Sequence, residues 1–199
     1  MQISVLPLGA LQTNCYVVAD ETAGVCLVID PGDEGELVAK AIERMGLRCD
    51  RIALTHGHYD HVGGVRALHE ATGAPVSLPE ADLVLPENFT AGPLFYTELL
   101  HEGDSFTVGG LTFDVLATPG HTPGSSCLRC GDALFTGDTL FEGSCGRTDM
   151  PGGDVGDMMA SLRRLYELEG DYHVFPGHGG SSTLEAERRN NFYMKEAVR

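Results

Sequence analysis

The chain has 199 residues, of which 42% are hydrophobic, and its 13 lysines and arginines against 29 aspartates and glutamates give a formal net charge of −16. The hydrophobic fraction is ordinary for a globular protein, and the length suits a single domain over residues 1–199. The negative charge argues against nucleic acid or an anionic membrane as a partner. It does not exclude a small anionic substrate, because a bound metal can dominate the local field.

The N-terminus and the cysteines bear on the compartment. No apolar run approaches the length of a membrane span, and the first residues, MQISVL, lack the basic region and long apolar core of a signal peptide. Six cysteines are scattered along the chain. Cys127 and Cys130 have CxxC spacing, but they fall inside a strand pattern and have no partner pair. We therefore expect a cytoplasmic protein with reduced thiols.

The first 30 residues predict a β-rich block. Runs over 3–9, 14–20 and 25–30, separated by turn-like residues, indicate an antiparallel meander. Asp30 ends the third run and precedes a Pro-Gly turn. Two roles are open for Asp30: a simple turn-forming residue, or a carboxylate that holds a metal-binding histidine in place.

A helix is expected next. Asp33 and Glu36 have the spacing of a capping box, which places the start of the helix at Asp33. Apolar residues at helical spacing predict its buried stripe. This stripe consists of Val38, Ile42 and Met45.

After a short apolar strand, the segment THGHYDHVGG at 55–64 is the centre of the sequence. It holds four ligand-type residues within six positions: His56, His58, Asp60 and His61. Alternation lets His56 and His58 point the same way from an extended chain, whereas Asp60 and His61 turn elsewhere as a helix begins. This geometry favours two neighbouring metal ions, and imidazole with carboxylate suits zinc, iron or manganese. A polar loop of exposed histidines is the alternative, but four ligand types in six positions at a strand end argue against it.

Residues 79–103 are the least predictable part of the chain. They follow a predicted strand at 74–78 and contain apolar residues that either cover the site as a loop or simply pack: Phe95, Tyr96, Leu99 and Leu100. His101 has no companion ligand, so we assign it no metal role.

The second half is again β-rich and brings three more ligand-type residues to strand ends. The alternating strand 111–118 runs into a turn rich in proline and glycine that presents His121, and a hairpin then leads to Asp138. Asp154 is expected to cap an amphipathic helix, and a short strand ends before His178. A lone histidine or aspartate beside glycine is usually a turn residue, so the inference depends on the whole set.

The two β-rich halves, each followed by helices, predict the fold. We expect an α/β protein in which two mixed β-sheets pack face to face with helices outside, a four-layer αββα sandwich. The ligand-type residues would then lie along one edge.

Taken in order, seven residues resemble the metal-ligand pattern of the metallo-β-lactamase superfamily, and the resemblance covers essentially the whole chain: His56, His58, Asp60, His61, His121, Asp138 and His178. It implies the metallo-β-lactamase fold. It also implies two divalent metal ions, zinc foremost, with iron or manganese as alternatives. One ion would be held by His56, His58 and His121. The other would be held by Asp60, His61 and His178.

Asp138 would bridge both ions, and this resemblance gives Asp60 and Asp138 a catalytic role. In such sites the ions lie roughly 3.5–4 Å apart and hold a hydroxide as the nucleophile. True metallo-β-lactamases typically lack a bridging aspartate at this point, which disfavours that activity. Nucleases of the superfamily carry an inserted domain, for which 199 residues leave no room.

Within the superfamily the chain is most similar to the glyoxalase II group of hydroxyacylglutathione hydrolases, especially its short single-domain members. The segments VIDPG at 28–32, FEGSCGRTD at 141–149 and PGHG at 176–179 carry this likeness. It implies hydrolysis of a small-molecule thioester.

Arg147 falls where the larger enzymes of this group place a basic residue near glutathione, so it is a candidate substrate-binding residue. A salt bridge with a nearby carboxylate is the alternative. The chain lacks the tyrosines and the helical C-terminal domain with which the larger enzymes bind glutathione. Arg188 and Arg189 are candidates to substitute for that domain, although a solvated helix face explains them as well.

Persulfide dioxygenases on the same fold are a second resemblance, and they share the CGRTD segment at 145–149. They use one iron, held by residues that match His56, His121 and Asp138. The sequence thus leaves two enzymes open, a dinuclear thioester hydrolase and a mononuclear iron dioxygenase. A non-catalytic member is disfavoured, because seven clustered polar ligands are costly to bury without a metal.

Overall fold

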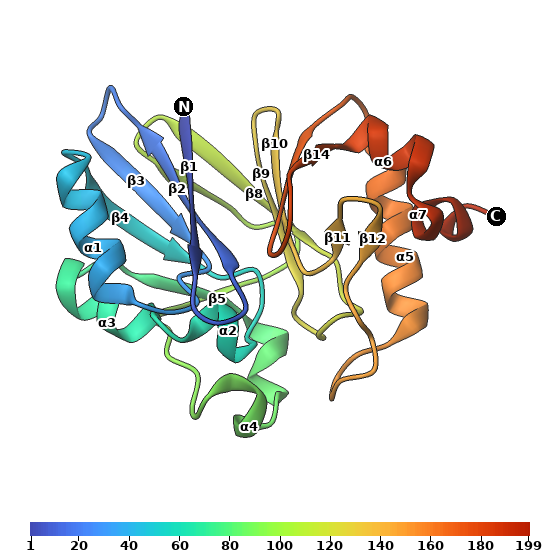
Figure 1. Cartoon of the computed structure of the whole chain (residues 1–199), viewed down its shortest axis with the longest axis horizontal. Coiled ribbons are helices and arrows are strands. Elements are labelled where there is room, and N and C mark those ends of the chain that lie inside the picture. Colours follow the sequence, from blue (N-terminus) through green and yellow to red (C-terminus); the bar gives the residue numbers. More distant parts are fainter.

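Two six-stranded β-sheets pack face to face in the computed structural model, which describes residues 1–199 (Figure 1). The first sheet contains, in spatial order, β1 (Gln2–Leu8), β2 (Thr13–Asp20), β3 (Val25–Ile29), β4 (Arg48–Ala53), β5 (Val76–Pro79) and β6 (Glu98–Leu100). The second contains β14 (Ser182–Thr183), β13 (His173–Pro176), β10 (Ala133–Gly137), β9 (Ser126–Cys130), β8 (Leu111–Ala117) and β7 (Ser105–Val108). Both sheets mix parallel and antiparallel pairs, as predicted.

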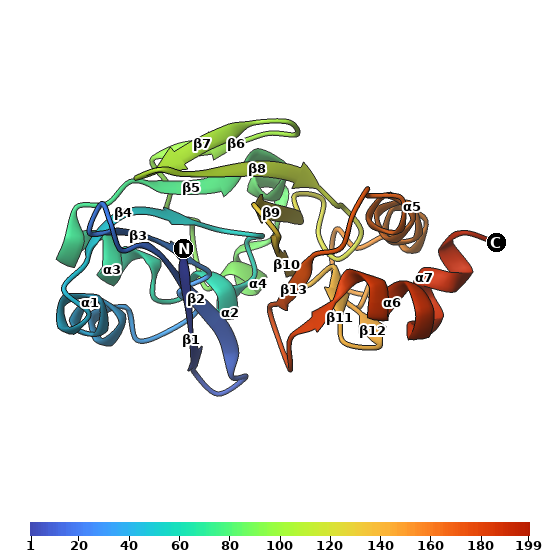
Figure 2. The same ribbon diagram turned by 90° about the horizontal axis from the view of Figure 1, so that it is seen from above.

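Helices cover both outer faces, which completes the predicted αββα sandwich (Figure 2). The first sheet is covered by α1 (Gly35–Arg44) and α3 (Val65–Thr72). The second is covered by α5 (Val155–Tyr166), α6 (Leu184–Asn190) and α7 (Phe192–Ala197). The shorter elements are α2 (Tyr59–Val62), the 3-10 helix η1 (Glu80–Val84), α4 (Glu87–Thr90), β11 (Leu140–Phe141) and β12 (Ser144–Cys145). None of the helices has both the length and the apolar character needed to cross a membrane.

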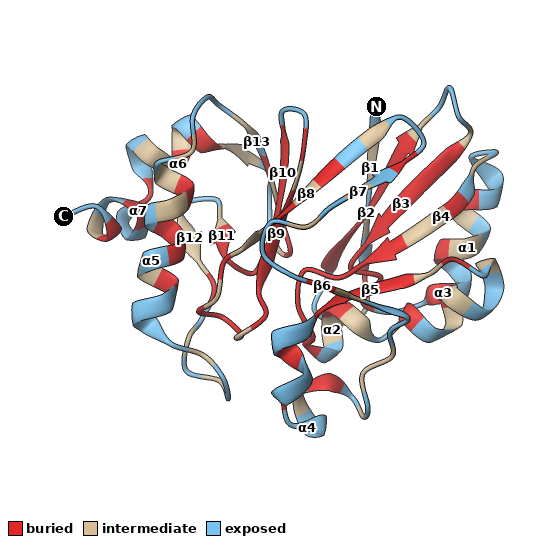
Figure 3. Cartoon of the chain, turned by 180° about the vertical axis from the view of Figure 1, so that it is seen from behind, coloured by how far each residue is buried: buried red, intermediate tan, exposed pale blue.

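The alternation along the strands builds the core. In β2, Cys15, Val17 and Ala19 pack against the helix-side cluster, while Tyr16 and Val18 pack between the two sheets. Figure 3 shows buried residues running along the strands and the inner sides of the helices. All six cysteines are free thiols.

The start of α1 differs from the prediction. The helix begins at Gly35, after Glu34 in a left-handed conformation (φ 52°), and no side chain caps it. The left-handed conformation of Glu34 prevents an earlier start, and Gly35 then packs so closely that a Cβ on it would lie 2.1 Å from the carbonyl oxygen of Gly64. The carboxylate of Asp33 instead accepts a hydrogen bond from the backbone N–H of Glu34 (2.7 Å). The stripe prediction is also wrong at Met45, which is exposed, although Val38 and Ile42 are buried as expected.

Other local predictions are confirmed or refined. The Asp154 carboxylate caps α5 by accepting from the N–H of Asp157, as expected. The single helix expected after the histidine cluster is two helices, α2 and α3, which Gly63 and Gly64 separate. The unpredicted stretch 79–103 forms η1, α4 and the edge strand β6.

The strand ends that carry the ligand-type residues meet at one edge of the sandwich, where backbone hydrogen bonds join the two sheets. The N–H of Asn14 donates to the carbonyl of Gly177 (2.8 Å), and the N–H of Ser126 donates to that of Thr55 (2.9 Å). These bonds join the loop after β13 to β2 and the loop after β4 to β9, and the N–H of Gly177 also donates to the carbonyl of Gly137 at the end of β10 (2.8 Å).

Candidate metal centre

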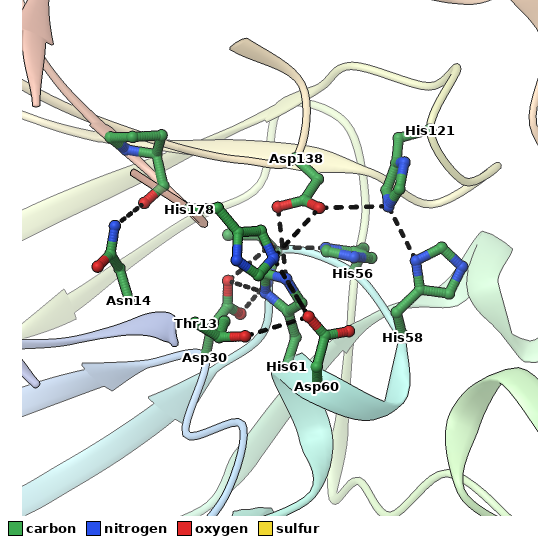
Figure 4. Close-up of polar contacts among 12 residues, drawn as sticks. Thr13, Asn14, Asp30, His56, His58, Asp60, His61, His121, Asp138 and His178 are labelled. Atoms are coloured by element: carbon green, nitrogen blue, oxygen red, sulfur yellow. Dashed lines mark hydrogen bonds and ion pairs between the residues drawn. The ribbon is translucent and has the colours of Figure 1, made fainter. Parts of the chain in front are cut away.

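Seven side chains converge at this edge, from loops of both sheets (Figure 4). Their nitrogen and oxygen atoms form three overlapping groups in which the atoms lie within 4.8 Å of one another. The groups are His56, His58 and His121; His56, His61 and Asp138; and Asp60, His61 and His178. The structure thus brings together every residue that the sequence singled out as a metal ligand, and two of the groups correspond to the two ligand sets inferred from the resemblance.

The first group consists of three buried imidazoles. Nδ1 of His58 lies 2.9 Å from Nε2 of His121, and the ring of His56 lies 4.9 Å, centre to centre, from each of the other two. His56 and His58 leave the end of β4, whereas His121 comes from the turn between β8 and β9.

Asp138 lies between the first group and the second. Its Oδ1 is 3.4 Å from Nε2 of His61, and its Oδ2 is 3.5 Å from Nε2 of His121 and 3.6 Å from Nε2 of His178. Oδ2 of Asp60 lies 3.2 Å from Nε2 of His178 and 3.6 Å from Nε2 of His61. One carboxylate therefore reaches both groups from the end of β10.

The cluster fits a divalent cation. Nε2 of His56, Nε2 of His61 and Oδ1 of Asp138 are buried and make no hydrogen bond. Leaving such a group unsatisfied costs about 1–3 kcal/mol, which coordination of a cation would offset. Nε2 of His58 also lacks a partner, although Nδ1 is the nitrogen that faces the cluster. Imidazole and carboxylate donors suit zinc, iron and manganese alike.

Asp30 orients two of the histidines. Its oxygens accept from the N–H of Thr55 (2.8 Å), from the Thr55 hydroxyl (2.6 Å) and from Nδ1 of His61 (2.9 Å). Because the Thr55 hydroxyl donates to Asp30, its oxygen accepts from Nδ1 of His56 (3.1 Å). Both rings then present Nε2 to the cluster. Asp30 itself adopts a left-handed turn conformation (φ 51°), so it combines the two roles left open by the sequence.

The Gly146–Arg147 segment accepts a hydrogen bond from His121 and packs against the backbone of Asp138. Nδ1 of His121 donates to the carbonyl of Arg147 (2.7 Å), which directs Nε2 to the cluster. A Cβ on Gly146 would lie 1.8 Å from the carbonyl oxygen of Asp138, so only glycine allows this approach.

Two further supporting residues were missed by the sequence analysis. The Thr13 hydroxyl donates to Oδ2 of Asp60 (3.1 Å). The Asn14 amide donates to the carbonyls of Pro176 and Gly179 (3.0 Å each), on either side of His178. Their only signal was polarity at the start of a strand that is otherwise apolar.

Burial and neighbouring charges shift the pKa values of the clustered histidines in different directions. Burial lowers the pKa of His56 well below its usual value and that of His58 to about 4, with the neighbouring imidazoles acting in the same direction. Burial alone would also lower the pKa values of His61 and His178, but the neighbouring carboxylates raise both. Binding of a metal to His61 and His178 needs the neutral imidazoles, so it would compete with the protonation that these carboxylates favour.

The candidate substrate-binding arginines all make contacts within the chain. Nε and Nη2 of Arg147 donate to the two carboxylate oxygens of Asp149 (2.7 and 2.9 Å), the salt bridge anticipated as the alternative. Arg188 donates to the carbonyls of Tyr166 and Gly170, and Arg189 pairs with Glu185. Arg188 is thus held against the backbone of neighbouring segments, whereas Arg189, like Arg147, lies in an exposed ion pair.

Comparison with known proteins agrees with this geometry. A family model described as the metallo-β-lactamase superfamily matches residues 8–178. GloC of Haemophilus influenzae, a hydroxyacylglutathione hydrolase, is 32% identical over 218 residues, 98% of each chain.

Three solved structures show the same similarity. BLEG-1, described as a B3 metallo-β-lactamase, aligns with a TM-score of 0.87 and 34% identity over 97% of this chain and 99% of its own. TTHA1623, in a di-iron-bound form, aligns with a TM-score of 0.84 and 39% identity over 96% of this chain and 99% of its own. ETHE1 from Myxococcus xanthus aligns with a TM-score of 0.83 and 31% identity over 96% of this chain and 84% of its own.

We expect Asp30→Asn to weaken metal binding by about 10–100-fold, because it removes a charge and one acceptor oxygen from the group that orients His56 and His61. Asparagine tolerates the left-handed backbone, so the turn should persist. Zinc titration of the metal-free protein against a competing chelator measures the effect. Asp33→Asn is the control, since Asp33 is exposed and bonds only its neighbour's N–H. Unchanged zinc affinity in Asp30→Asn would show that the rings are held without it.

Proposed function

The chain belongs to the metallo-β-lactamase superfamily, and from that premise we propose that it is a metal-dependent hydrolase that cleaves a thioester of the hydroxyacylglutathione type. Members of the superfamily are typically metal-dependent hydrolases, and a second relative, YqgX of Bacillus subtilis, is described as a probable metallo-hydrolase. The similarity to GloC over nearly the whole of both chains supports a thioester as the substrate.

The observation that carries the proposal is the position of Asp138 between two groups of ligands. His56, His58 and His121 would hold one divalent ion, and Asp60, His61 and His178 the other, with Asp138 shared. Zinc is our first choice, and the di-iron-bound form of TTHA1623 supports iron as an alternative.

Bound divalent ions would polarise the thioester carbonyl and lower the pKa of water from 15.7 to about 7, which supplies a nucleophile at neutral pH. The chain itself holds the rings: Asp30 orients His61, and the Arg147 carbonyl orients His121. A leaving thiolate needs no proton donor, because an ordinary thiol has a pKa of about 8.5. Cys145, beside Gly146, is a poor nucleophile, since burial raises its pKa to about 11.

The second candidate is a persulfide dioxygenase that uses one iron at His56, His121 and Asp138. The 31% identity to ETHE1, over 96% of this chain, supports keeping it. The similarity to BLEG-1, described as a B3 metallo-β-lactamase, makes β-lactams a necessary assay substrate.

Metal analysis with three assays tests the proposal. We expect about two metal ions per chain, turnover of S-lactoylglutathione without oxygen uptake, and negligible β-lactam hydrolysis. A single tightly bound iron with oxygen uptake on glutathione persulfide, and no thioester turnover, would establish the dioxygenase instead. Efficient β-lactam cleavage would contradict the inference that a shared Asp138 disfavours β-lactamase activity.

Asp138→Asn should lower occupancy of the second metal more than the first and reduce kcat by ~10²-fold or more, because one shared ligand oxygen is lost. Folding should survive, since no apolar group is removed. Metal content, circular dichroism and kcat are measured on one preparation. Asp132→Asn, at the exposed opposite end of the same strand, is the control and should change none of them. Retention of two metals with normal turnover would exclude Asp138 as the shared ligand.

We propose that Arg147 exchanges its pairing with Asp149 for a carboxylate of the substrate's thiol carrier. Arg147→Ala should then raise KM with little change in kcat. The His121 contact is preserved, because it uses the backbone carbonyl of Arg147. Asp149→Ala separates the alternatives. If the salt bridge matters only for structure, both variants raise KM alike, whereas a substrate-binding guanidinium predicts that Asp149→Ala leaves KM unchanged or lowers it.

A further inference from the structure

Asp82 is a fully buried carboxylate that the proposed mechanism does not use. It lies in η1, within the stretch that the sequence left unpredicted. Its Oδ2 accepts from the N–H of Gly57 (2.7 Å) and the hydroxyl of Thr122 (3.0 Å), and its Oδ1 accepts from the N–H of Gly124 (2.6 Å). Asp82 makes no ion pair, so these neutral donors are what stabilise its charge in the interior.

The three donors belong to the two loops that carry the first group of ligands. Gly57 stands between His56 and His58, and Thr122 directly follows His121. The first loop leaves the first sheet, and the second connects two strands of the other sheet. One carboxylate therefore ties together loops that no local sequence feature connects.

We propose that Asp82 is a positioning residue for the first metal, because it fixes the loops of His56, His58 and His121 relative to one another. The inference rests on the proposed two-ion site. It adds a residue that supports the half of the site that would hold the first metal.

The glycines show how closely the three segments pack. A Cβ on Gly124 would lie 2.7 Å from Cγ and Oδ1 of Asp82, and a Cβ on Gly57 would lie 3.3 Å from Cβ of Asp82. Substitution of Gly124 would push the carboxylate away from its donors, whereas substitution of Gly57 would require its neighbours to shift by a few tenths of an ångström. Glycine at position 124 is what permits the short hydrogen bond to Oδ1.

A directed chain of hydrogen bonds extends the contact through the His121 loop. The N–H of Thr122 donates to Oγ of Ser125 (3.0 Å). Since the Thr122 hydroxyl donates to Asp82, its oxygen accepts from the Ser125 hydroxyl (2.8 Å). The residue after His121 is thus held by a fully satisfied network that ends on the carboxylate.

The second group has supports of its own in Thr13 and Asn14, and it shares Asp30 with the first group. Asp30 holds His61, Thr13 holds Asp60, and Asn14 bonds the carbonyls that flank the remaining ligand, His178. None of these contacts involves Asp82. Loss of Asp82 should therefore affect the first metal and spare the second.

The test is zinc titration of metal-free Asp82→Asn against a competing chelator, with NMR of the histidine rings to identify which imidazoles bind at each step. We expect affinity at His56, His58 and His121 to fall by about 10–100-fold, while binding at His61 and His178 is unchanged. Thr122→Val removes one of the three hydrogen bonds and should give a smaller loss at the same histidines. Thr122→Val serves as the test variant if Asp82→Asn does not fold.

Asp20→Asn is the matched control. The Asp20 carboxylate also accepts three hydrogen bonds, in its case all from backbone N–H groups, those of Thr22, Ala23 and Gly110. It joins turns of the two sheets at the opposite end of β2. It should lower the melting temperature without changing zinc affinity.

Two results would overturn the role of Asp82. One is lower thermal stability with normal zinc affinity, as expected for Asp20→Asn, which would make the contact purely structural. The other is equal weakening of both binding steps, which would mean a general loosening of the site. A wild-type protein that binds one metal only would contradict the two-ion proposal, while loss of that metal at His56, His58 and His121 in Asp82→Asn would still support the role of Asp82.

Discussion

The crowding of buried imidazoles and carboxylates at one edge is the constraint on which the rest of the structure depends. Three of the inward-facing atoms, on His56, His61 and Asp138, have no hydrogen-bond partner. At about 1–3 kcal/mol each, such losses are large against a typical folding stability of about 5–15 kcal/mol. A cluster of this kind is sustained by a rigid surrounding fold and by a cation that coordinates the unsatisfied atoms.

The rigidity comes from backbone segments that approach more closely than side chains would allow. A Cβ on Gly32 would lie 1.6 Å from the carbonyl oxygen of Asp60, and one on Gly137 would lie 2.4 Å from the Thr55 hydroxyl. Each glycine therefore places one ligand-bearing loop directly against another element of the site. The two large apolar layers anchor the strands, and the glycines bring the strand ends together.

Local patterns could be predicted from the residues themselves, and the convergence of His121, Asp138 and His178 on the first cluster followed from the family resemblance. The supporting long-range contacts could not be predicted. The alternation of the strands and the spacing from His56 to His61 indicated the sandwich and the ligand cluster, because both depend on near neighbours. The contacts of Thr13 with Asp60 and of Asp82 with Gly57 and Gly124 join residues 25–47 positions apart. Nothing in the flanking sequence distinguishes these polar residues from ordinary turn or cap residues.

The two supporting carboxylates act on different parts of the site. Asp30 reaches His61 directly and His56 through Thr55, so it couples the two groups of ligands. Asp82 bonds residues that directly adjoin ligands of the first group, Gly57 between His56 and His58 and Thr122 after His121. The proposed hydrolase needs both groups, whereas the alternative dioxygenase needs one iron. The second group, with its own supports in Thr13 and Asn14, is therefore the part of the chain on which the choice between the two activities depends.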